Sequence, residues 1–219
     1  MPIKRAESSI GWYKESKVVG ENRRKGIRGN FMEFVEPIRD RKKIEAIKKL
    51  LRGSNLRDYV LFTFGINSGL RVSDLLKLQV VDVRDEKGRI KDRVTLREKK
   101  TGKSKTFPFS ETVVKALKEY LVDKDLANSS ALFPSRKGGG PITRQQAYRI
   151  LNDAAKAVGL KDKIGTHTLR KTFGYHAYLT GVDITRIQAL MNHSSPRETL
   201  RYIGITQDEL DDVYLNLNL

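Results

Sequence analysis

The spacing of apolar residues most constrains what this chain can fold into. Ile44, Ile47 and Leu51 recur at the three- and four-residue intervals that place side chains on one face of a helix. A second, strongly apolar stretch at residues 59–66 follows Asn55, which is a suitable N-cap. The same spacing predicts further helices over residues 72–78, 111–121, 144–158, 167–180, 184–191, 196–202 and 207–216.

One region breaks this helical pattern with a period of two. Valines at residues 80–83 are followed by a turn signal at residues 86–88, and apolar and charged side chains then alternate around residues 94–96. Residues 100–103 form the expected tip of a hairpin, and residues 105–109 form its return strand. We therefore predict an α+β fold: a mostly helical domain with a small antiparallel β-sheet that carries a lysine hairpin.

The charge balance points to a polyanionic partner. The 219 residues include 43 Lys and Arg against 26 Asp and Glu, a formal net charge of +17. Such an excess favours a nucleic-acid partner and a binding constant that falls with salt. The alternative is general, non-specific binding of the kind that basic ribosomal proteins show. Without cysteine, the chain forms no disulfide or thiolate metal site. No membrane span or signal peptide is apparent, so we expect a cytoplasmic protein that acts on DNA.

The chain divides into two predicted regions. Residues 1–36 are rich in Lys, Arg, Gly and Ser and lack a sustained apolar period, which predicts a flexible basic arm. The arm would contact phosphates without sequence preference, or it is a plain solubilising tail. Residues 37–219 carry the apolar periods of one sizeable folded domain.

A set of residues at helix starts and turns has the chemistry of phosphoryl transfer. That reaction needs a nucleophile, neutralisation of the non-bridging oxygens and a proton for the leaving oxygen. Arg71 and Arg170 can each donate two N–H groups to one phosphate, and His167 lies on the same helical face as Arg170. His193 opens a turn, and Tyr202, nine residues further on, offers a phenol oxygen as the nucleophile.

Four other basic residues complete the predicted site. Lys100, at the hairpin tip, is a candidate acid that protonates the leaving 5′ oxygen. Lys99, Lys103 and Lys105 lie close to it in the sequence and are rivals for this role, or they contact the DNA backbone instead. Arg144 opens a helix with donors suited to phosphates, although an ordinary solvated helix start has the same composition. The acidic residues are scattered, so we predict no metal site and no cofactor.

These residues occur in a familiar order. The chain resembles the tyrosine recombinases, also called the phage integrase family, over about residues 37–216. Residues 69–75, Gly-Leu-Arg-Val-Ser-Asp-Leu, are similar to the family's first arginine box, and residues 100–102 are similar to its lysine hairpin. His167-Thr168-Leu169-Arg170 matches the H-x-L-R box. His193 stands where the family usually has Leu-Gly-His, with Asn192 in place of the Gly, and Tyr202 falls at the spacing of the nucleophile.

The resemblance implies a catalytically active mobile-element recombinase, encoded by a bacterium or phage. Tyr202 would form a 3′-phosphotyrosyl link and free a 5′ hydroxyl, which then attacks a partner strand without ATP or metal. His167 would be the general base, His193 a transition-state donor, and Asp74 a support for the arginines. Double-stranded DNA would be the partner, with self-association on DNA through the C-terminal helix at residues 207–216. The alternative is that this helix packs on its own domain.

Three alternatives stay open at this point. A type IB topoisomerase would use the same groups to relax supercoils, and a regulator or recombinase fragment would occupy DNA without chemistry. Tyr214 is a rival nucleophile, but no His precedes it at the right distance.

Family members commonly carry a helical core-binding domain before the catalytic domain, where this chain has only the basic arm, so we expect either a short recombinase or a fragment.

Overall fold

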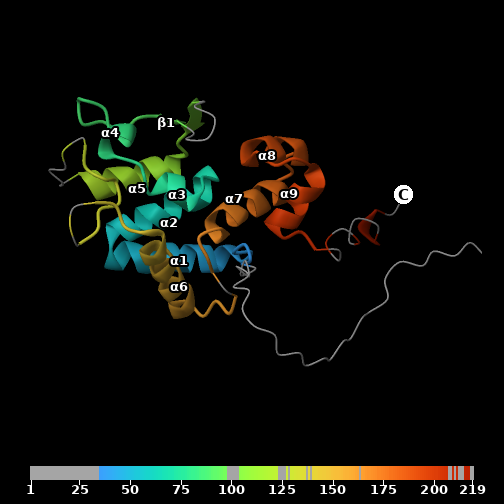
Figure 1. The fold of residues 1–219 in the computed structure, drawn as a ribbon. Coiled ribbons are helices and arrows are strands. Elements are labelled where there is room, and N and C mark those ends of the chain that lie inside the picture. Colours follow the sequence, from blue (N-terminus) through green and yellow to red (C-terminus); the bar gives the residue numbers. More distant parts are fainter. Residues whose placement is uncertain are drawn as a thin grey trace, which may run out of the picture. The chain divides into compact units, whose positions relative to one another are not determined.

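The computed structural model describes residues 35–97, 104–122, 127, 129–136, 138, 140–162, 164–206, 209, 211 and 215–217. These residues belong to one unit, built from helices and one small sheet (Figure 1). All but the last two residues of the predicted basic arm lie outside the described residues. No helix within the described ranges is long and apolar enough to cross a membrane.

The first two helices confirm the predicted apolar periods. Helix α1 (Arg41–Ser54) begins at the N-cap Asp40, and α2 (Leu56–Ser68) begins at the predicted N-cap Asn55, whose side chain accepts a hydrogen bond from the backbone of Arg57. Helix α2 ends at Gly69, which adopts the left-handed conformation with φ of 62°. A side chain at this position would be strained, so glycine sets the sharp exit that leads into Arg71.

The valine run at residues 80–83 corrects a prediction. The period of two suggested a strand, but the structure has a single helical turn, α4 (Val80–Val83), after another short helix, α3 (Val72–Leu75). Gln79 and Asp82 form a capping box at the start of α4. Val80 and Val83 are buried while Val81 is 39% exposed, which is the three-residue spacing of a helix.

The predicted hairpin is present. Strand β1 (Arg93–Arg97) pairs antiparallel with β2 (Ser104–Pro108), and Leu96 lies opposite Lys105 in the register. Val94 is buried against the main core, whereas Thr95 and Thr106 share a hydrogen bond of 3.0 Å on the exposed face. The fold class is therefore confirmed, while the tip at residues 98–103 lies outside the described residues.

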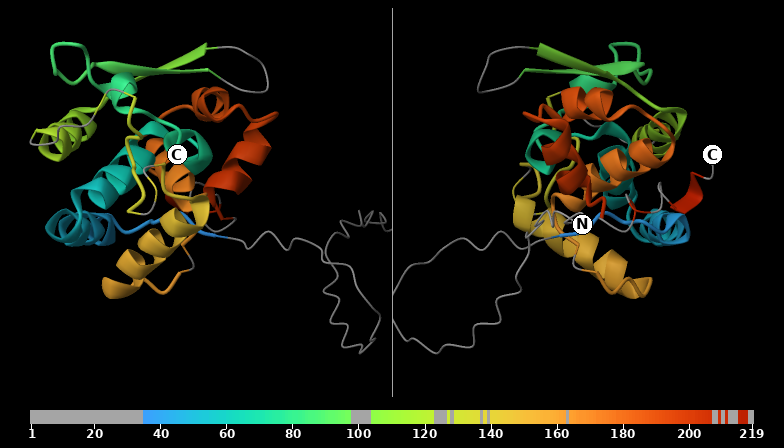
Figure 2. Two further views of the ribbon diagram at one scale, coloured as in Figure 1. Left: turned by 60° about the vertical axis from the view of Figure 1, so that its left-hand side comes forward. Right: turned by 90° about the vertical axis from the view of Figure 1, so that its right-hand side faces the viewer.

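The remaining helices build two hydrophobic cores. Helices α5 (Glu111–Leu121) and α6 (Arg144–Ala157) start at the capping residues Ser110 and Thr143, as expected, and they join α1 and α2 in the main core. The C-terminal helices α7 (Thr168–Leu179), α8 (Ile184–Met191) and α9 (Pro196–Ile203) lie together, as Figures 1 and 2 show. They form a second, smaller core.

Helix α7 belongs to both cores and so fixes the geometry between them. Leu169 is buried in the main core, and Tyr175 is buried in the smaller one. At Gly174 an added Cβ would collide with the Met191 side chain and would lie 2.6 Å from Cγ2 of Ile203. Glycine here lets α7 approach α8 and α9 closely, which sets the distance between the residues that these helices carry.

A second set of contacts fastens α9 to the start of the unit. The Arg39 guanidinium donates to the carbonyl of Gly204, directly after α9, and to both carboxylate oxygens of Glu209 at 3.0 and 3.1 Å. It also stacks over the Tyr175 ring at 4.7 Å, while the backbone N–H of Ile38 donates to the Thr172 hydroxyl on α7. We call this set of contacts the Arg39 clasp.

Candidate active site

Five of the predicted catalytic residues meet in one place. Arg71, His167 and Arg170 line a cavity of about 170 Å³ at the starts of α3 and α7. The hydroxyl of Tyr202 on α9 lies 3.4 Å from Nδ1 of His167. The ring of His193 meets the Tyr202 ring edge-on, with 4.8 Å between centroids. The fold therefore gathers residues that the sequence separates by up to 131 positions.

Arg170 is the buried centre of this site. Its guanidinium donates hydrogen bonds to the carbonyl of Gly69 after α2 and, at 2.6 Å, to the carbonyl of Met191 at the end of α8. The partial negative charge at two helix C-termini thereby stabilises a cation that is only 6% exposed. Burial lowers the pKa of Arg170, while the Tyr202 oxygen, which also accepts a hydrogen bond from it, and Asp74 raise that pKa.

Arg71 presents the second guanidinium from the edge of the cavity. It occupies the N-cap of α3 with an exposed side chain that makes no cap hydrogen bond, so it is held by the backbone turn after Gly69. Its charge reaches Tyr202 and both histidines of the site. Asp74 forms an ion pair with Lys77 at 3.6 Å, and its predicted support of the arginines remains a proposal.

His167 precedes α7 and is exposed toward the cavity. Its pKa is lowered first by partial desolvation and then by the positive charges of Arg144, Lys171, Arg170 and Arg71. A lowered pKa favours the neutral imidazole at neutral pH. The neutral ring is the form that can accept a proton from the nearby phenol.

His193 occupies a turn that explains the unusual Asn192. Asn192 ends α8 in the left-handed conformation with φ of 51°, which Asn tolerates better than most residues other than Gly. Nδ1 of His193 lies 3.2 Å from the Thr199 hydroxyl, and that hydroxyl donates its proton to the carbonyl of Ser195. Nδ1–H is therefore the donor of the pair, and Nε2 carries a hydrogen only when His193 is protonated.

The phenol of Tyr202 experiences opposed influences. Burial raises the pKa of Tyr202, and the charges of Arg170 and Arg71, with a hydrogen bond from Arg170, lower it. The hydroxyl thus lies among two arginines and His167, whose lowered pKa favours the neutral imidazole. This arrangement can remove the phenol proton and stabilise the oxygen that remains.

The predicted basic residues around the site have different outcomes. Arg144, the first residue of α6, lines the same cavity as Arg71 and His167. Lys100 and Lys103 lie outside the described residues, and Lys105 is placed only by its backbone in β2. For these three lysines the sequence-based roles stay predictions.

Sequence reasoning missed two residues that touch the predicted set. Thr199 holds the His193 ring, and Lys171 lies beneath the Tyr202 ring, with Nζ 5.5 Å from its centroid. Lys171 could have been found, because it stands four positions after His167 and so shares its helical face. The Gly69 and Met191 carbonyls leave no signal in a sequence, because every residue has one.

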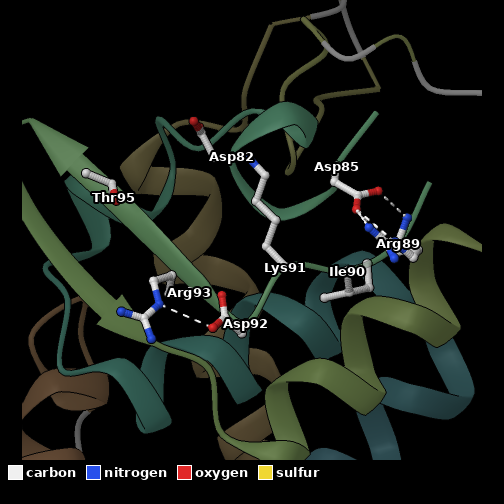
Figure 3. A pocket seen from close by; sticks show the side chains of 8 residues that line it. All are labelled: Asp82, Asp85, Arg89, Ile90, Lys91, Asp92, Arg93 and Thr95. Carbon is white, nitrogen blue, oxygen red and sulfur yellow. Dashed lines mark hydrogen bonds and ion pairs between the residues drawn. The ribbon is translucent and has the colours of Figure 1, made fainter. Parts of the chain in front are cut away.

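A larger pocket of about 650 Å³ lies elsewhere, between α4, the following loop and β1 (Figure 3). Four of its charged side chains pair with each other: Arg89 with Asp85 at 2.9 Å and Arg93 with Asp92 at 3.3 Å. It includes none of the predicted catalytic residues, so the smaller cavity is the candidate active site. Among the described residues, no group of three or more His, Cys, Asp or Glu is arranged to hold a metal ion.

The family model and the similar proteins point to the same family. The model of the phage integrase family matches residues 40–209. The "Probable integrase/recombinase YoeC" of Bacillus subtilis (strain 168) is 48% identical and covers 84% of this chain and 97% of its own length. Tyrosine recombinase XerD of Corynebacterium glutamicum is 35% identical over 73% of this chain, and this chain spans about half of it, 52%.

Solved structures share the fold. The crystal structure of XerA recombinase aligns with a TM-score of 0.67 at 24% identity, over 85% of this chain and 67% of that one. The catalytic domain of bacteriophage HP1 integrase aligns with a TM-score of 0.53 at 19% identity, over 84% of this chain and 95% of that domain. The mostly helical architecture with its small sheet is thus that of a known domain type.

Proposed function

We propose that this chain, which belongs to the phage integrase family, breaks and rejoins double-stranded DNA through a covalent 3′-phosphotyrosyl link to Tyr202. One observation carries the proposal: the Tyr202 hydroxyl lies 3.4 Å from Nδ1 of His167, and the nearby Arg170 lowers the pKa of the phenol. A candidate nucleophile, a base and a phosphate-binding cation are thereby within reach of one reacting phosphorus.

The cleavage step follows from these groups. The phenol proton passes to His167 as the Tyr202 oxygen attacks the phosphorus, and the bond from phosphorus to the 5′ oxygen breaks. Lys100 supplies a proton to that 5′ oxygen, which leaves as a hydroxyl. The phosphodiester is exchanged for a phosphotyrosyl ester of similar energy, so the 5′ hydroxyl of a partner strand can reverse the step without ATP.

Charge stabilisation falls to the remaining groups. Arg71 and Arg170 donate to the non-bridging oxygens as negative charge develops there. Burial lowers the pKa of His193, and the negative phosphate opposes this and favours the protonated ring, which donates from Nε2. The Asp74 carboxylate supports the charged form of Arg170.

DNA would be held mainly through its phosphates. Arg144 lines the cavity and would contact the DNA backbone there, and the predicted contacts of Lys103 and Lys105 would add to it. The basic arm at residues 1–36 adds contacts without sequence preference. Solved relatives include XerH bound to its difH substrate and the Tn1549 transposon integrase bound to circular intermediate DNA, which supports a DNA partner.

A suicide half-site tests the proposed function. The full chain should form a protein–DNA band that survives detergent, disappears with protease and is absent from Tyr202→Phe. Tyr214→Phe is the matched control and should keep the adduct. An adduct that persists in Tyr202→Phe and is lost in Tyr214→Phe would overturn the assignment. Relaxation of a supercoiled plasmid that lacks paired sites would favour the topoisomerase alternative, and the absence of any adduct would favour a DNA-binding regulator.

We further propose that the C-terminal segment docks on a neighbouring subunit on DNA. Glu209 is bound by Arg39 and Tyr175 of its own unit, so the segment is anchored there. Beyond this anchor, Leu215 and Leu217 are 73% and 60% exposed. An apolar surface of this kind suits a groove on a second copy of the chain.

A short truncation distinguishes docking of this segment on a neighbouring subunit from packing on its own domain. Removing residues 212–219 keeps Glu209 and the Arg39 clasp. The truncated protein should stay folded and bind one half-site, but it should lose cooperativity between half-sites and fail to complete strand exchange. If it instead aggregates or melts much earlier as a monomer, the segment packs on its own domain.

A further inference from the structure

Lys171 occupies an unusual place for a lysine. It follows Arg170 in α7 and is only 6% exposed. Its Nζ lies 5.5 Å from the centroid of the Tyr202 ring. A cation within about 6 Å of an aromatic centroid is attracted by the negative face of the ring, and more strongly where water is excluded.

Burial and a nearby carboxylate act in opposite directions on the charge of this lysine. Burial lowers the pKa of Lys171, and the Glu36 carboxylate opposes that change. Glu36 is in turn close to Arg39 of the clasp, at 3.7 Å. A buried lysine costs free energy that an apolar side chain of the same length would not. Space filling alone therefore does not account for lysine at this position.

We propose that Lys171 is a positioning residue for Tyr202: its buried ammonium holds the phenol ring in place and stabilises the negative charge that develops as the phenol proton leaves. This inference rests on the proposed role of Tyr202 as the nucleophile. Arg170 and Arg71 act at the oxygen end of the ring, and His193 meets its edge. Lys171 acts on the ring itself, with Nζ 5.5 Å from its centroid.

The test compares neutral and charged replacements in the full chain. Lys171→Met and Lys171→Gln remove the charge at similar length, and Lys171→Arg keeps it. Lys118→Met, on the exposed face of α5, is the matched control for the loss of one positive charge. Each variant is measured for half-site affinity, melting temperature and the single-turnover rate of adduct formation on the suicide half-site at saturating protein.

We expect Lys171→Met to bind the half-site as tightly as the wild type and to melt at the same or a higher temperature, yet to form the adduct about tenfold more slowly. Lys171→Arg should recover most of the rate, and Lys118→Met should match the wild type. Wild-type rates in both neutral variants, or a slower rate matched by lost affinity or stability, would overturn the inference. If the wild type itself forms no adduct through Tyr202, it is the proposed function that fails.

Discussion

The hydroxyl of Tyr202 lies 3.4 Å from Nδ1 of His167, although 35 positions separate the two residues in the chain. The contact depends on how α9 packs against α7, because His167 precedes α7 and Tyr202 is near the end of α9. The proton transfer that we propose is thus controlled by helix packing as well as by the identity of the two groups.

The pH dependence of cleavage should reflect His167. As a base it must be neutral, so the rate falls as pH falls through its pKa. Partial desolvation and then neighbouring positive charges lower that pKa, so the acid limb of kcat/KM should lie below the ordinary histidine value of about 6.5. A rate profile at limiting DNA measures this limb, and a limb well above that value would contradict the assignment.

Arg144 offers a separate test of the same electrostatics. Its charge lowers the pKa of His167, so Arg144→Gln should raise that pKa and move the acid limb of kcat/KM to higher pH. Arg89→Gln, which removes an equal charge at the larger pocket, is the control and should leave the limb in place. An identical shift in both variants would mean that net charge alone is responsible.

The two arginines should differ in their effect on stability. Arg71→Ala and Arg170→Ala should each slow cleavage by about 10²–10³ with a much smaller loss of DNA affinity. Arg71 is exposed, so its variant should melt like the wild type. Arg170→Ala leaves the Gly69 and Met191 carbonyls without their donor and should lower the free energy of unfolding by about 1–3 kcal/mol. Equal losses of binding and rate would show that an arginine only holds DNA.

Lys100 can be tested through its leaving group. Lys100→Ala should slow cleavage of an ordinary half-site, because the 5′ oxygen then leaves without a proton. A bridging 5′ sulfur leaves readily as a thiolate, so a half-site that carries this sulfur should restore the rate. If the sulfur substrate is cut no faster than the oxygen substrate, the acid is another residue, and Lys103→Ala is the next variant to compare.

Cleavage should proceed in excess EDTA, because the proposed phosphotyrosyl route assigns charge stabilisation to Arg71, Arg170 and His193. The suicide half-site assay measures this directly, with a Mg²⁺-dependent nuclease as the control that EDTA must stop. Loss of adduct in EDTA and its return with Mg²⁺ would contradict the proposed mechanism.

A pair of glycine substitutions tests the close packing of α7. Gly174→Ala places a Cβ against Met191 and Ile203, so it should lower the free energy of unfolding by about 1–3 kcal/mol and slow adduct formation. Gly53→Ala, in α1 with nothing within 4 Å, should be neutral or stabilising by up to about 1 kcal/mol. Thermal melts and adduct rates measure both. Equal behaviour of the two variants would remove the packing argument.

The sequence predicted those parts of the fold and site that depend on local patterns. Helix α8 was predicted with its observed bounds, since apolar spacing and a clear cap mark both ends. The valines of α4 were interpreted wrongly because the pattern of four residues cannot distinguish a strand from one helical turn. The capping box of Gln79 and Asp82 decides in favour of the helical turn. Contacts across the fold, such as Arg39 with Glu209, depend on packing and have no periodic signal.

The mechanics of α9 suggest how DNA and nucleophile meet. The helix packs into the smaller core through Ile203 and is tied at its end by the Arg39 clasp on Gly204. A tyrosine on a helix held in this way travels little. We therefore expect the strand to be carried to Tyr202, so that an error in DNA alignment appears as a misplaced or absent cut and not as a slower nucleophile.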